Sequence, residues 1–395
     1  MDDVKMPTVL MVMICLRCTL GGAEKRYARL FERLVAQPDS QHKLLINRAM
    51  LCLLQAAGIL THCDAHLMVL DPPSARMIWL ARRRSIAAPV DAIWYVGQCW
   101  WAIRMARPQT VHPLLTAVYL TLPGLVVNPQ VRRVMSAYSY QFESYRDRRL
   151  FGMSISAAIK RWAMQRAAVV EALSDSIRCD LIMRGIDAQR IMVAPGSFTD
   201  LSVCRPAVYK RKWVTFVGRF VEIKNPLLLA QALPALVAHH PDVRIFFIGE
   251  GPLEEPLRQA IIEAGLSASV TIQFHPQPTE ILNESSIFVS LQREENYPSQ
   301  SLLEAMACGN AVVATDVGET WRLVDKTTGI RVQPTAVAVA AAIIALLDDP
   351  ALAQRQQAAR ARILAEHSAE RFFAHMASVY QMALQVKTTY RTAVV

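Results

Sequence analysis

The feature that most constrains the fold is a regular alternation of short apolar runs and helical patterns over residues 213–315. The apolar runs are Trp213–Val217, Arg244–Ile248, Val270–Phe274, Ile287–Ser290 and Ala311–Thr315. The segments between them have helical patterns, at Pro226–Val237, Leu253–Ala264, Thr279–Glu284 and Leu302–Ala307. Continuous apolar strands separated by helices are typical of right-handed βαβ units, whose parallel sheet is covered on both faces. We therefore predict a doubly wound α/β domain in this part of the chain.

The first half of the chain carries a weaker version of the same pattern. An apolar run at Val9–Leu16 is followed by Gly21-Gly22 and by a helical pattern at Ala23–Val35. Residues 94–130 resist assignment, and Thr199–Lys212 lacks periodicity and contains a proline, so we place a linker there. Further strands are predicted at Leu44–Asn47, His66–Leu70, Val169–Leu173 and Ile191–Ala194. Helices are predicted in the tail at Thr335–Leu347, Ala351–Glu366 and Glu370–Val386.

These patterns together predict two tandem doubly wound, Rossmann-like domains with a cleft between them. The first domain would span residues 1–205 and the second residues 206–369. In open α/β sheets, ligands bind outside the carboxyl ends of the strands. The residues that directly follow predicted strands are therefore the candidates for a functional site.

Composition limits the class of protein. The chain has 395 residues, of which 53% are hydrophobic and 19% charged, so it is long and apolar enough to fold. No apolar run reaches the roughly 18 residues that span a bilayer, and the acidic start Met1-Asp2-Asp3 is unlike a secretory signal. We expect a cytoplasmic protein. Its eight cysteines are single except for Cys15-Leu-Arg-Cys18, which has no second pair, so we expect buried reduced thiols.

The net charge of +10 is concentrated in the first half of the chain. Residues 1–205 contain 26 Lys and Arg against 15 Asp and Glu, whereas the remainder contains 17 against 18. Such charge could serve nucleic acid, anionic lipid or a phosphate-bearing acceptor, or it could be solvated surface. Apolar neighbours at Met77–Leu80 favour an anionic membrane surface, at the inner face of the plasma membrane, and no nucleic-acid-binding motif is present. The basic clusters are Arg82–Arg84, Arg132-Arg133, Arg146–Arg149 and Lys160-Arg161.

A polar loop at residues 294–301 turns directly into a helix of small residues. Ser301-x-x-Glu304 has capping-box spacing, which predicts Ser301 as the N-cap and Glu304 in the first turn. Gly309 would end the helix. A helix N-terminus offers unpaired N–H groups and a positive dipole end, which suit a phosphate. The alternative is an ordinary capped helix with no ligand.

Two cations follow another predicted strand. Gly218-Arg219 comes directly after it, and Lys224-Asn225 precedes a helix that Pro226 begins. A planar guanidinium and a point charge at the mouth of a parallel sheet suit a diphosphate. Gly21-Gly22 would let the backbone approach a phosphate or sugar closely, although the G-x-G-x-x-G fingerprint is absent. We interpret Gly249-Glu-Gly-Pro252 as a structural turn.

Metal and triad chemistry are not indicated by the sequence. There is no D-x-D pair, no His/Cys/Asp cluster with metal-ligand spacing and no Ser-His-Asp signature. We therefore predict a site without a metal or cofactor. If a diphosphate leaves in this site, Arg219, Lys224 and backbone N–H groups must stabilise its charge.

In combination, these motifs resemble those of glycosyltransferase family 4, retaining enzymes of the GT-B fold that use nucleotide sugars. The resemblance is dense over residues 213–333 and thin over residues 37–165. The matching segments are Gly21-Gly22-Ala23-Glu24, Val217-Gly218-Arg219-Phe220, Lys224-Asn225, Ile248-Gly249-Glu250-Gly251-Pro252, Leu303-Glu304-Ala305-Met306-Ala307-Cys308-Gly309 and Ala311-Val312-Val313-Ala314-Thr315.

The resemblance implies roles for individual residues. Arg219 and Lys224 would hold the donor diphosphate, and Glu304 would bind the ribose hydroxyls. Gly22 would face the phosphate from the first domain, and the last helix, near residues 370–395, would cross back to that domain. The remaining implied donor contacts are Gly218, Glu295, Ser299, Gln300 and Ser301.

The chain departs from the family pattern at two places. The family usually has a glutamate eight residues before the position of Glu304, where this chain has Asn296. Asparagine can hydrogen-bond a sugar hydroxyl but supplies no carboxylate, so either Glu295 takes the role or the site works without that charge. The histidine expected in the first domain is also absent from Val134–Tyr140. We interpret His112, which lies earlier, as structural rather than as a ligand contact.

The resemblance implies a retaining, metal-independent glycosyltransferase. It would move a sugar from a UDP-, GDP- or ADP-sugar to a hydroxyl of a saccharide or lipid-linked acceptor, in surface polysaccharide or lipopolysaccharide synthesis. Asn296 keeps a second hypothesis open, a non-catalytic sugar-nucleotide-binding or scaffold subunit. The thin match in the first half leaves a third, nucleotide-sugar epimerisation.

Overall fold

The chain divides into two compact units. The computed structural model describes residues 6–14, 20–72, 87–114, 117–128, 130–137, 159–194, 197, 199–295 and 297–386, with residues 87–92 described by their backbone alone. Unit 1 comprises Met1–Ala194 and Phe373–Val395, and unit 2 comprises Pro195–Phe372. The Cys15-Leu-Arg-Cys18 motif and the clusters Arg82–Arg84 and Arg146–Arg149 lie outside the described residues.

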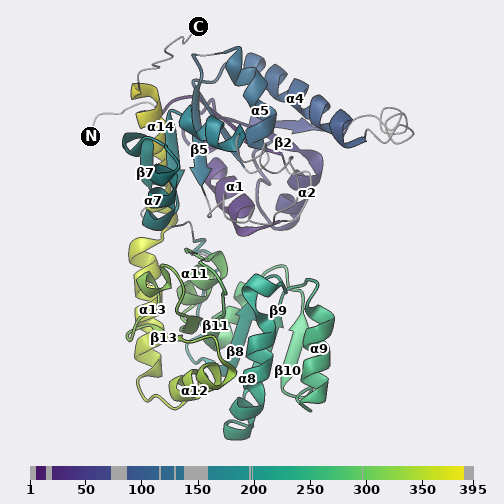
Figure 1. The fold of residues 1–395 in the computed structure, drawn as a ribbon, viewed down its shortest axis with the longest axis vertical. Helices are drawn as coiled ribbons and strands as arrows, with labels where there is room; N and C mark the ends of the chain where they lie inside the picture. The colour runs from purple at the N-terminus through teal and green to yellow at the C-terminus, as the bar shows by residue number, and fades with distance from the viewer. Residues whose placement is uncertain are drawn as a thin grey trace. The chain divides into compact units, whose positions relative to one another are not determined.

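Unit 1 is built on a parallel sheet that, within the described residues, has seven strands in the order β3-β2-β1-β4-β5-β6-β7 (Figure 1). The strands are β1 (Val9–Met13), β2 (Lys43–Asn47), β3 (Leu67–Leu70), β4 (Thr110–Leu114), β5 (Arg132–Ala137), β6 (Val169–Ala172) and β7 (Ile191–Val193). The helices are α1 (Gly22–Val35), α2 (Arg48–Ala56), α4 (Ala87–Ala106), α5 (Ala117–Val126) and α7 (Asp175–Met183).

Unit 2 repeats this architecture with a parallel sheet that has six strands in the order β10-β9-β8-β11-β12-β13 over its described residues. The strands are β8 (Arg211–Val217), β9 (Arg244–Ile248), β10 (Val270–Gln273), β11 (Ser285–Ser290), β12 (Ala311–Thr315) and β13 (Gly329–Val332). The helices are α8 (Pro226–His239), α9 (Glu254–Glu263), α10 (Thr279–Glu284), α11 (Gln300–Ala307), α12 (Ala336–Leu347) and α13 (Leu352–Glu366).

Helices cover both faces of the unit 2 sheet, which explains its continuous apolar strands. Successive side chains of a strand point to opposite faces. Val289 and Val313 accordingly pack into one buried cluster with α8 and α12, whereas Phe288 and Val312 pack into another with α11 and α13. Because helices cover both faces of the sheet, its strands do not need to alternate apolar with polar residues. The predicted pair of doubly wound, Rossmann-like domains is confirmed.

The first division between the units falls at Ala194 and Pro195, before the linker that the sequence predicts. Part of that predicted linker packs into unit 2. Thr199 pairs with Ser368 in an isolated parallel bridge, and Cys204 is buried in the cluster under α11. These contacts are made with residues far along the chain, so local periodicity could not indicate them.

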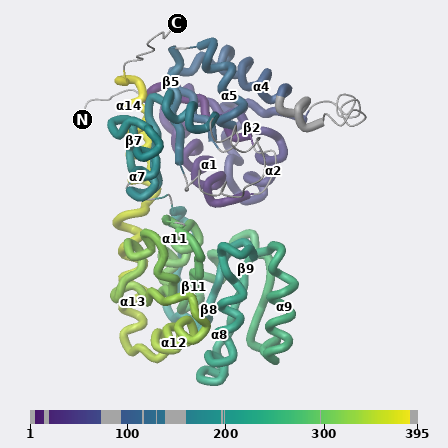
Figure 2. Tube along the Cα trace, viewed as in Figure 1, coloured from purple at the N-terminus to yellow at the C-terminus, as the bar shows by residue number. Residues whose placement is uncertain are grey.

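The C-terminal helix α14 (Ala369–Gln385), at the yellow end of the trace in Figure 2, carries the chain back to unit 1. Its Tyr380 hydroxyl lies 2.9 Å from Nδ1 of His112 on β4, and Nε2 of His112 lies 2.9 Å from the Ser136 hydroxyl. Ser136 and Tyr27 both donate to the buried carboxylate of Glu171. The Ser136 hydrogen is therefore engaged, which leaves Nε2–H of His112 as donor and Nδ1 as acceptor. His112 is a structural histidine, as the sequence interpretation has it.

No single described helix combines the length and apolar character that crossing a bilayer requires. α12 and α13 meet that test only as a pair, with a bend of 103° between them.

Buried neutral histidines predict an acid-sensitive fold. Burial lowers the pKa of His112 to about 4, and it lowers the pKa of His42 and of His367 to about 4 as well. His42 and His367 also accept backbone N–H bonds, from Val9 and Ser197, which require a neutral ring nitrogen. Because the unfolded chain binds these protons below pH ~6.5 and the folded chain does not, stability falls as pH drops toward 4. For His112 alone the loss at pH 4 reaches about 3 kcal/mol.

Urea unfolding followed between pH 7 and pH 4 measures this effect. We expect His112→Gln to flatten the pH dependence, whereas substitution of the exposed His62 leaves it unchanged. An unfolding midpoint that stays constant through this range would contradict the assignment of neutral histidines.

Candidate active site

The strand order of unit 2 defines one position on the sheet where a ligand is expected. The chain runs outward from β8 to β9 and β10, and then returns to β11 on the other side of β8. β8 and β11 are therefore neighbours whose connections leave in opposite directions (Figure 1). Ligands of open α/β sheets bind at such switch points, outside the carboxyl ends of the strands. The loops that follow Val217 and Ser290 form this position.

The loop after β8 carries the two predicted cations. Arg219 is exposed, and Lys224 is half-buried at the end of a short 3-10 turn, Glu222–Lys224. Burial, and then the positive charge of Arg219, lower the pKa of Lys224 to about 8. Asn225 follows with φ 54° and ψ 49°, a left-handed conformation that asparagine tolerates better than most residues. Pro226 then begins α8 as predicted.

The loop after β9 holds the β8 loop in shape. The N–H of Gly218 donates to Ile248 O at 3.0 Å, and the N–H of Phe220 donates to Glu250 O at 2.8 Å. A Cβ on Gly249 would lie 2.0 Å from the carbonyl oxygen of Gly218, and one on Gly251 would lie 2.6 Å from that of Phe220. The two glycines are therefore required for the close approach of two backbones. This is the structural turn that the sequence indicates, and its role is to position the Arg219 loop.

The loop after β11 is joined directly to the β8 loop. The N–H of Arg293 donates to Ile223 O at 3.0 Å. The Arg293 guanidinium pairs with Glu222 at 2.9 Å and approaches Oδ1 of Asn225 at 3.4 Å. Sequence reasoning missed Arg293, although a cation three residues after a predicted strand is itself a signal. The contacts bring the predicted Lys224 segment and the predicted 294–309 segment to the same edge of the sheet.

Helix α11 begins two residues earlier than the capping-box spacing predicts. Ser299, not Ser301, is the N-cap, with extended backbone, and neither serine caps the helix through its side chain. Ser301 is thus inside the helix, and Glu304 lies beyond the first turn, where its Oε1 accepts from Nε2 of Gln300 at 3.1 Å. The prediction of Ser301 as the cap was wrong. The chain enters the helix at Ser299, directly after Pro298, which is two residues before the serine that the capping-box spacing selects.

The N-terminus of α11 still offers backbone donors. The N–H of Leu303 is the first to reach an intrahelical acceptor, Ser299 O at 3.0 Å. The N–H groups of the preceding residues therefore lack a partner within the helix, as at every helix start. Gln300, Ser301 and Glu304 are half-buried, and the apolar residues between them are buried. Gly309 ends the helix with φ 73° as predicted.

The position that departs from the family pattern, Asn296, lies outside the described residues. Its neighbour Glu295 accepts a hydrogen bond from the backbone N–H of Glu319 at 3.2 Å. A Cβ on Gly318 would lie 2.6 Å or less from three side-chain atoms of Glu295. The Glu295 carboxylate is thus held against the loop after β12. Its use as a replacement carboxylate stays a prediction.

Gly22 is the first residue of α1, which follows β1 in unit 1. There the switch point lies between β1 and β4, so Gly22 is near the expected ligand edge of its own sheet. The Glu24 carboxylate accepts from the N–H of Gly21 at 3.1 Å and supports this helix start. Of the predicted basic surface, Arg133 is instead buried on β5, and Lys160 is half-buried, where burial lowers its pKa to about 8.

The fold places the chain in the GT-B class. HepE of Anabaena, in its crystal structure with UDP and glucose, matches with a TM-score of 0.74 and 16% identity, over 95% of this chain and 99% of that chain. The sucrose-phosphate synthase from Thermosynechococcus elongatus matches with a TM-score of 0.72 and 16% identity, over 96% and 100% of the two chains. At these identities the likeness establishes the fold alone.

The sequence comparison matches part of the chain to a family model. Residues 211–349, which contain the β8 and β11 loops, match the family model described as glycosyl transferases group 1. The predicted resemblance to a family of glycosyltransferases is thereby confirmed. Among curated proteins, the phosphatidyl-myo-inositol mannosyltransferase of Mycolicibacterium smegmatis is 27% identical over 55% of this chain and 53% of its own length. The D-inositol 3-phosphate glycosyltransferase of Arthrobacter is 31% identical over 42% and 44%. The matches thus span about half or less of these relatives.

Proposed function

We propose that this protein is a retaining, metal-independent glycosyltransferase. In its reaction, the bond between the anomeric carbon of the donor sugar and the diphosphate oxygen breaks. A bond to an acceptor hydroxyl oxygen forms, and the hydroxyl proton passes to the departing diphosphate or to water. The observation that carries the proposal is the joining of the β8 and β11 loops through Arg293 and Ile223, which sets Arg219 and Lys224 at the same sheet edge as the loop that leads into α11.

Each group has a task in this account. Arg219 and Lys224 bind the diphosphate and stabilise the charge that it gains on leaving. The free N–H groups of α11 supply further donors, aided by the helix dipole. Glu304, one turn further along, binds the ribose hydroxyls. Crystal structures of HepE hold UDP and glucose or UDP-glucose, which supports a nucleotide sugar as donor.

For the acceptor we propose a hydroxyl of a saccharide or lipid-linked molecule in surface polysaccharide or lipopolysaccharide synthesis. The named phosphatidyl-myo-inositol mannosyltransferase supports an acceptor that is lipid-linked. We place the reaction in the cytoplasm, at the inner face of the plasma membrane.

The test is an assay of the purified chain in the presence of a metal chelator. UDP, GDP and ADP are first compared by thermal shift, because a bound ligand raises apparent stability. The matching nucleotide sugar is then incubated with and without acceptor, and the anomeric configuration of the product is determined by NMR. A product of retained configuration supports the proposal. Binding without transfer would favour a non-catalytic subunit, and an epimer formed without acceptor would favour an epimerase.

The pKa of Lys224 predicts how donor affinity depends on pH. In the free protein its ammonium is half-deprotonated at about pH 8, is mostly charged below that pH and is mostly neutral above it. A bound diphosphate favours the charged form, so donor binding above pH 8 must restore the proton. We expect the Kd of the nucleoside diphosphate to rise about tenfold per pH unit above 8, until the pKa of the complex is reached. Lys224→Arg should remove this slope, and an unchanged slope in that variant would exclude Lys224 as its source.

An exposed apolar face on α4 supports binding to a membrane surface. Tyr95, Cys99 and Ala102 are buried on one side of this helix, whereas Trp100, Trp101 and Met105 are 42%, 49% and 62% exposed. Arg104 lies over the Trp100 ring, 5.3 Å from its centroid. Tryptophan beside arginine on an exposed helix face is typical of the interfacial region of a bilayer.

We therefore expect the protein to bind anionic vesicles, and to bind them more weakly as salt is raised. Sedimentation with phosphatidylserine vesicles measures this. Replacing Trp100 and Trp101 together by serine should reduce binding several-fold, whereas Trp321→Ser, at a site 54% exposed in unit 2, should not. Binding indifferent to salt and to the double substitution would count against a peripheral role.

A further inference from the structure

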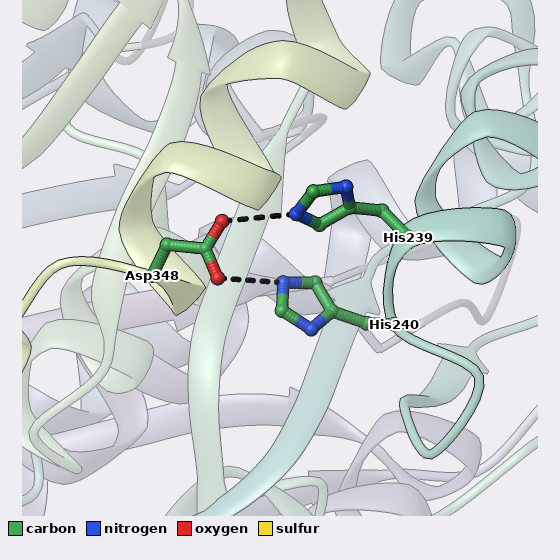
Figure 3. Close-up of side chains that lie close together, drawn as sticks. All are labelled: His239, His240 and Asp348. Atoms are coloured by element: carbon green, nitrogen blue, oxygen red, sulfur yellow. Dashed lines mark hydrogen bonds and ion pairs between the residues drawn. The ribbon is translucent and has the colours of Figure 1, made fainter.

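Two adjacent histidines and an aspartate meet on unit 2 at the end of the sheet away from the β8 and β11 loops. His239 is the last residue of α8, His240 is its C-cap, and Asp348 is the C-cap of α12. Nε2 of His239 lies 3.1 Å from Oδ2 of Asp348, and Nε2 of His240 lies 3.2 Å from Oδ1 (Figure 3). One ligand atom from each residue can be chosen so that all three lie within 4.8 Å of one another.

The separations fit a shared metal ion. Zn²⁺ binds imidazole nitrogen and carboxylate oxygen at about 2.0–2.2 Å in a tetrahedron, so neighbouring ligand atoms are about 3.3 Å apart. Each imidazole Nε2 is close to that distance from an oxygen of Asp348, Oδ2 for His239 and Oδ1 for His240. Two imidazoles and a carboxylate also suit Co²⁺, Ni²⁺ and Cu²⁺. The side chain of His240 is 11% exposed, whereas those of His239 and Asp348 are 54% and 51% exposed. One ligand is therefore held by packing while an ion can enter from solvent.

The backbone around the cluster also favours a cation. α8 and α12 pack side by side and both end here, and each helix C-terminus carries a partial negative charge of about half an electron. A carboxylate at such an end adds to this charge instead of balancing it. Asp348 stands there with the two histidines, which are its partners among the described residues. A divalent ion between the three side chains would neutralise the carboxylate and both helix ends.

We propose that His239, His240 and Asp348 bind one divalent transition-metal ion, Zn²⁺ in the first instance, and that the ion joins the C-terminal ends of α8 and α12. The site is structural. α8 begins beside Lys224 at the carboxyl edge of the sheet and runs to the amino edge, where β9 starts at Arg244. The ion therefore lies at the edge opposite the proposed donor site, and it stabilises unit 2 without taking part in transfer.

Sequence spacing could not indicate this site. The ligands include two consecutive residues and a third 109 residues further along the chain. The two rings can both face Asp348 because His240 leaves the helix, with φ −124° and ψ 81°, so its ring stands at 79° to that of His239.

The test uses the full chain without a histidine tag, stripped of metal by a chelator. Equilibrium dialysis against Zn²⁺ and Co²⁺ gives the number of ions per chain, and thermal unfolding gives the rise in Tm. We expect one ion per wild-type chain and a metal-dependent rise in Tm.

His240→Ala and Asp348→Asn should each lower the affinity for the metal by more than about tenfold. Loss of a group that only hydrogen-bonds a metal ligand already costs about 10- to 100-fold. His275→Ala, in a comparable pair with Glu280 at 3.6 Å, is the matched control.

A spectrum of bound Co²⁺ and a size-conserving variant show whether these three residues are the ligands. The absorption spectrum of bound Co²⁺ separates nitrogen and oxygen ligands from thiolates, because Cys52 and Cys179 are exposed and could bind metal themselves. Asp348→Asn keeps the size of the side chain, so a folded variant with lost binding supports the site. Equal binding by wild type and both ligand variants would overturn the proposal, as would a cobalt spectrum dominated by thiolate. Glycosyl transfer should be unchanged in all three variants, so this test fails or succeeds independently of the proposed function.

Discussion

Replacing Lys224 by alanine is expected to lower kcat/KM for glycosyl transfer by about two orders of magnitude, and Arg219→Ala should have an effect of the same order. Each removes a cation from the place where the leaving diphosphate gains charge, and one such electrostatic group is typically worth ~3 kcal/mol in the transition state. Lys224 is half-buried beside Arg219, so water cannot fully replace its charge. Glu304→Ala should act differently, chiefly by weakening donor binding.

The same strand provides matched controls for these variants. Arg211 and Lys212 stand at the amino end of β8, in exposed pairs with Glu284 at 2.7 Å and Asp242 at 2.9 Å. Their replacement by alanine removes an identical charge from unit 2 but at the opposite edge of the sheet. Initial rates over a range of donor concentrations separate kcat from KM. Full activity in Arg219→Ala and Glu304→Ala would exclude the assigned donor site.

Replacing Gly249 by alanine is expected to destabilise unit 2 by roughly 2–6 kcal/mol and to abolish donor binding. Its φ is 153°, and a Cβ would lie 2.0 Å from the Gly218 carbonyl oxygen, so the Arg219 loop must move. Overpacking and a strained backbone each typically cost ~1–3 kcal/mol. Urea unfolding and titration with the nucleoside diphosphate give the two quantities.

Gly265→Ala is the control for the conformational part of this loss. Gly265 also has positive φ, 69°, but a Cβ there has nothing within 4 Å. The control should therefore lose about 1–2 kcal/mol and retain donor affinity. If Gly249→Ala bound the donor as well as wild type, the β9 loop would not be what positions the Arg219 loop.

The fold of unit 2 could be predicted closely because its strands and helices differ in local pattern. The bounds of β9, α10 and β12 agree with the sequence prediction. Residues 94–130 of unit 1 resisted assignment for a physical reason. α4 is apolar on its exposed face as well as its buried one. α5 consists almost entirely of apolar residues and contains Pro123 in its interior. Neither helix therefore shows the amphipathic period on which sequence prediction depends.

Candidate site residues could be proposed from the sequence only where they lie close together in the chain. Arg219 and Lys224 could be proposed because both follow one predicted strand. Arg293 was missed because its partners, Ile223 and Glu222, come from another loop. The N-cap of α11 was misplaced because two serines compete within three residues, and spacing alone does not separate them. Long-range contacts of this kind exist only in the folded chain.

Hydrogen exchange with and without bound nucleoside diphosphate tests the central claim most directly, because it locates the donor without any substitution. We predict that a nucleotide which raises the Tm also protects the backbone of residues 218–225 and 293–304, and protects the amino edge of the same sheet, at residues 239–244, little or not at all. Protection confined to other segments, with these two loops unchanged at saturation, would contradict the account.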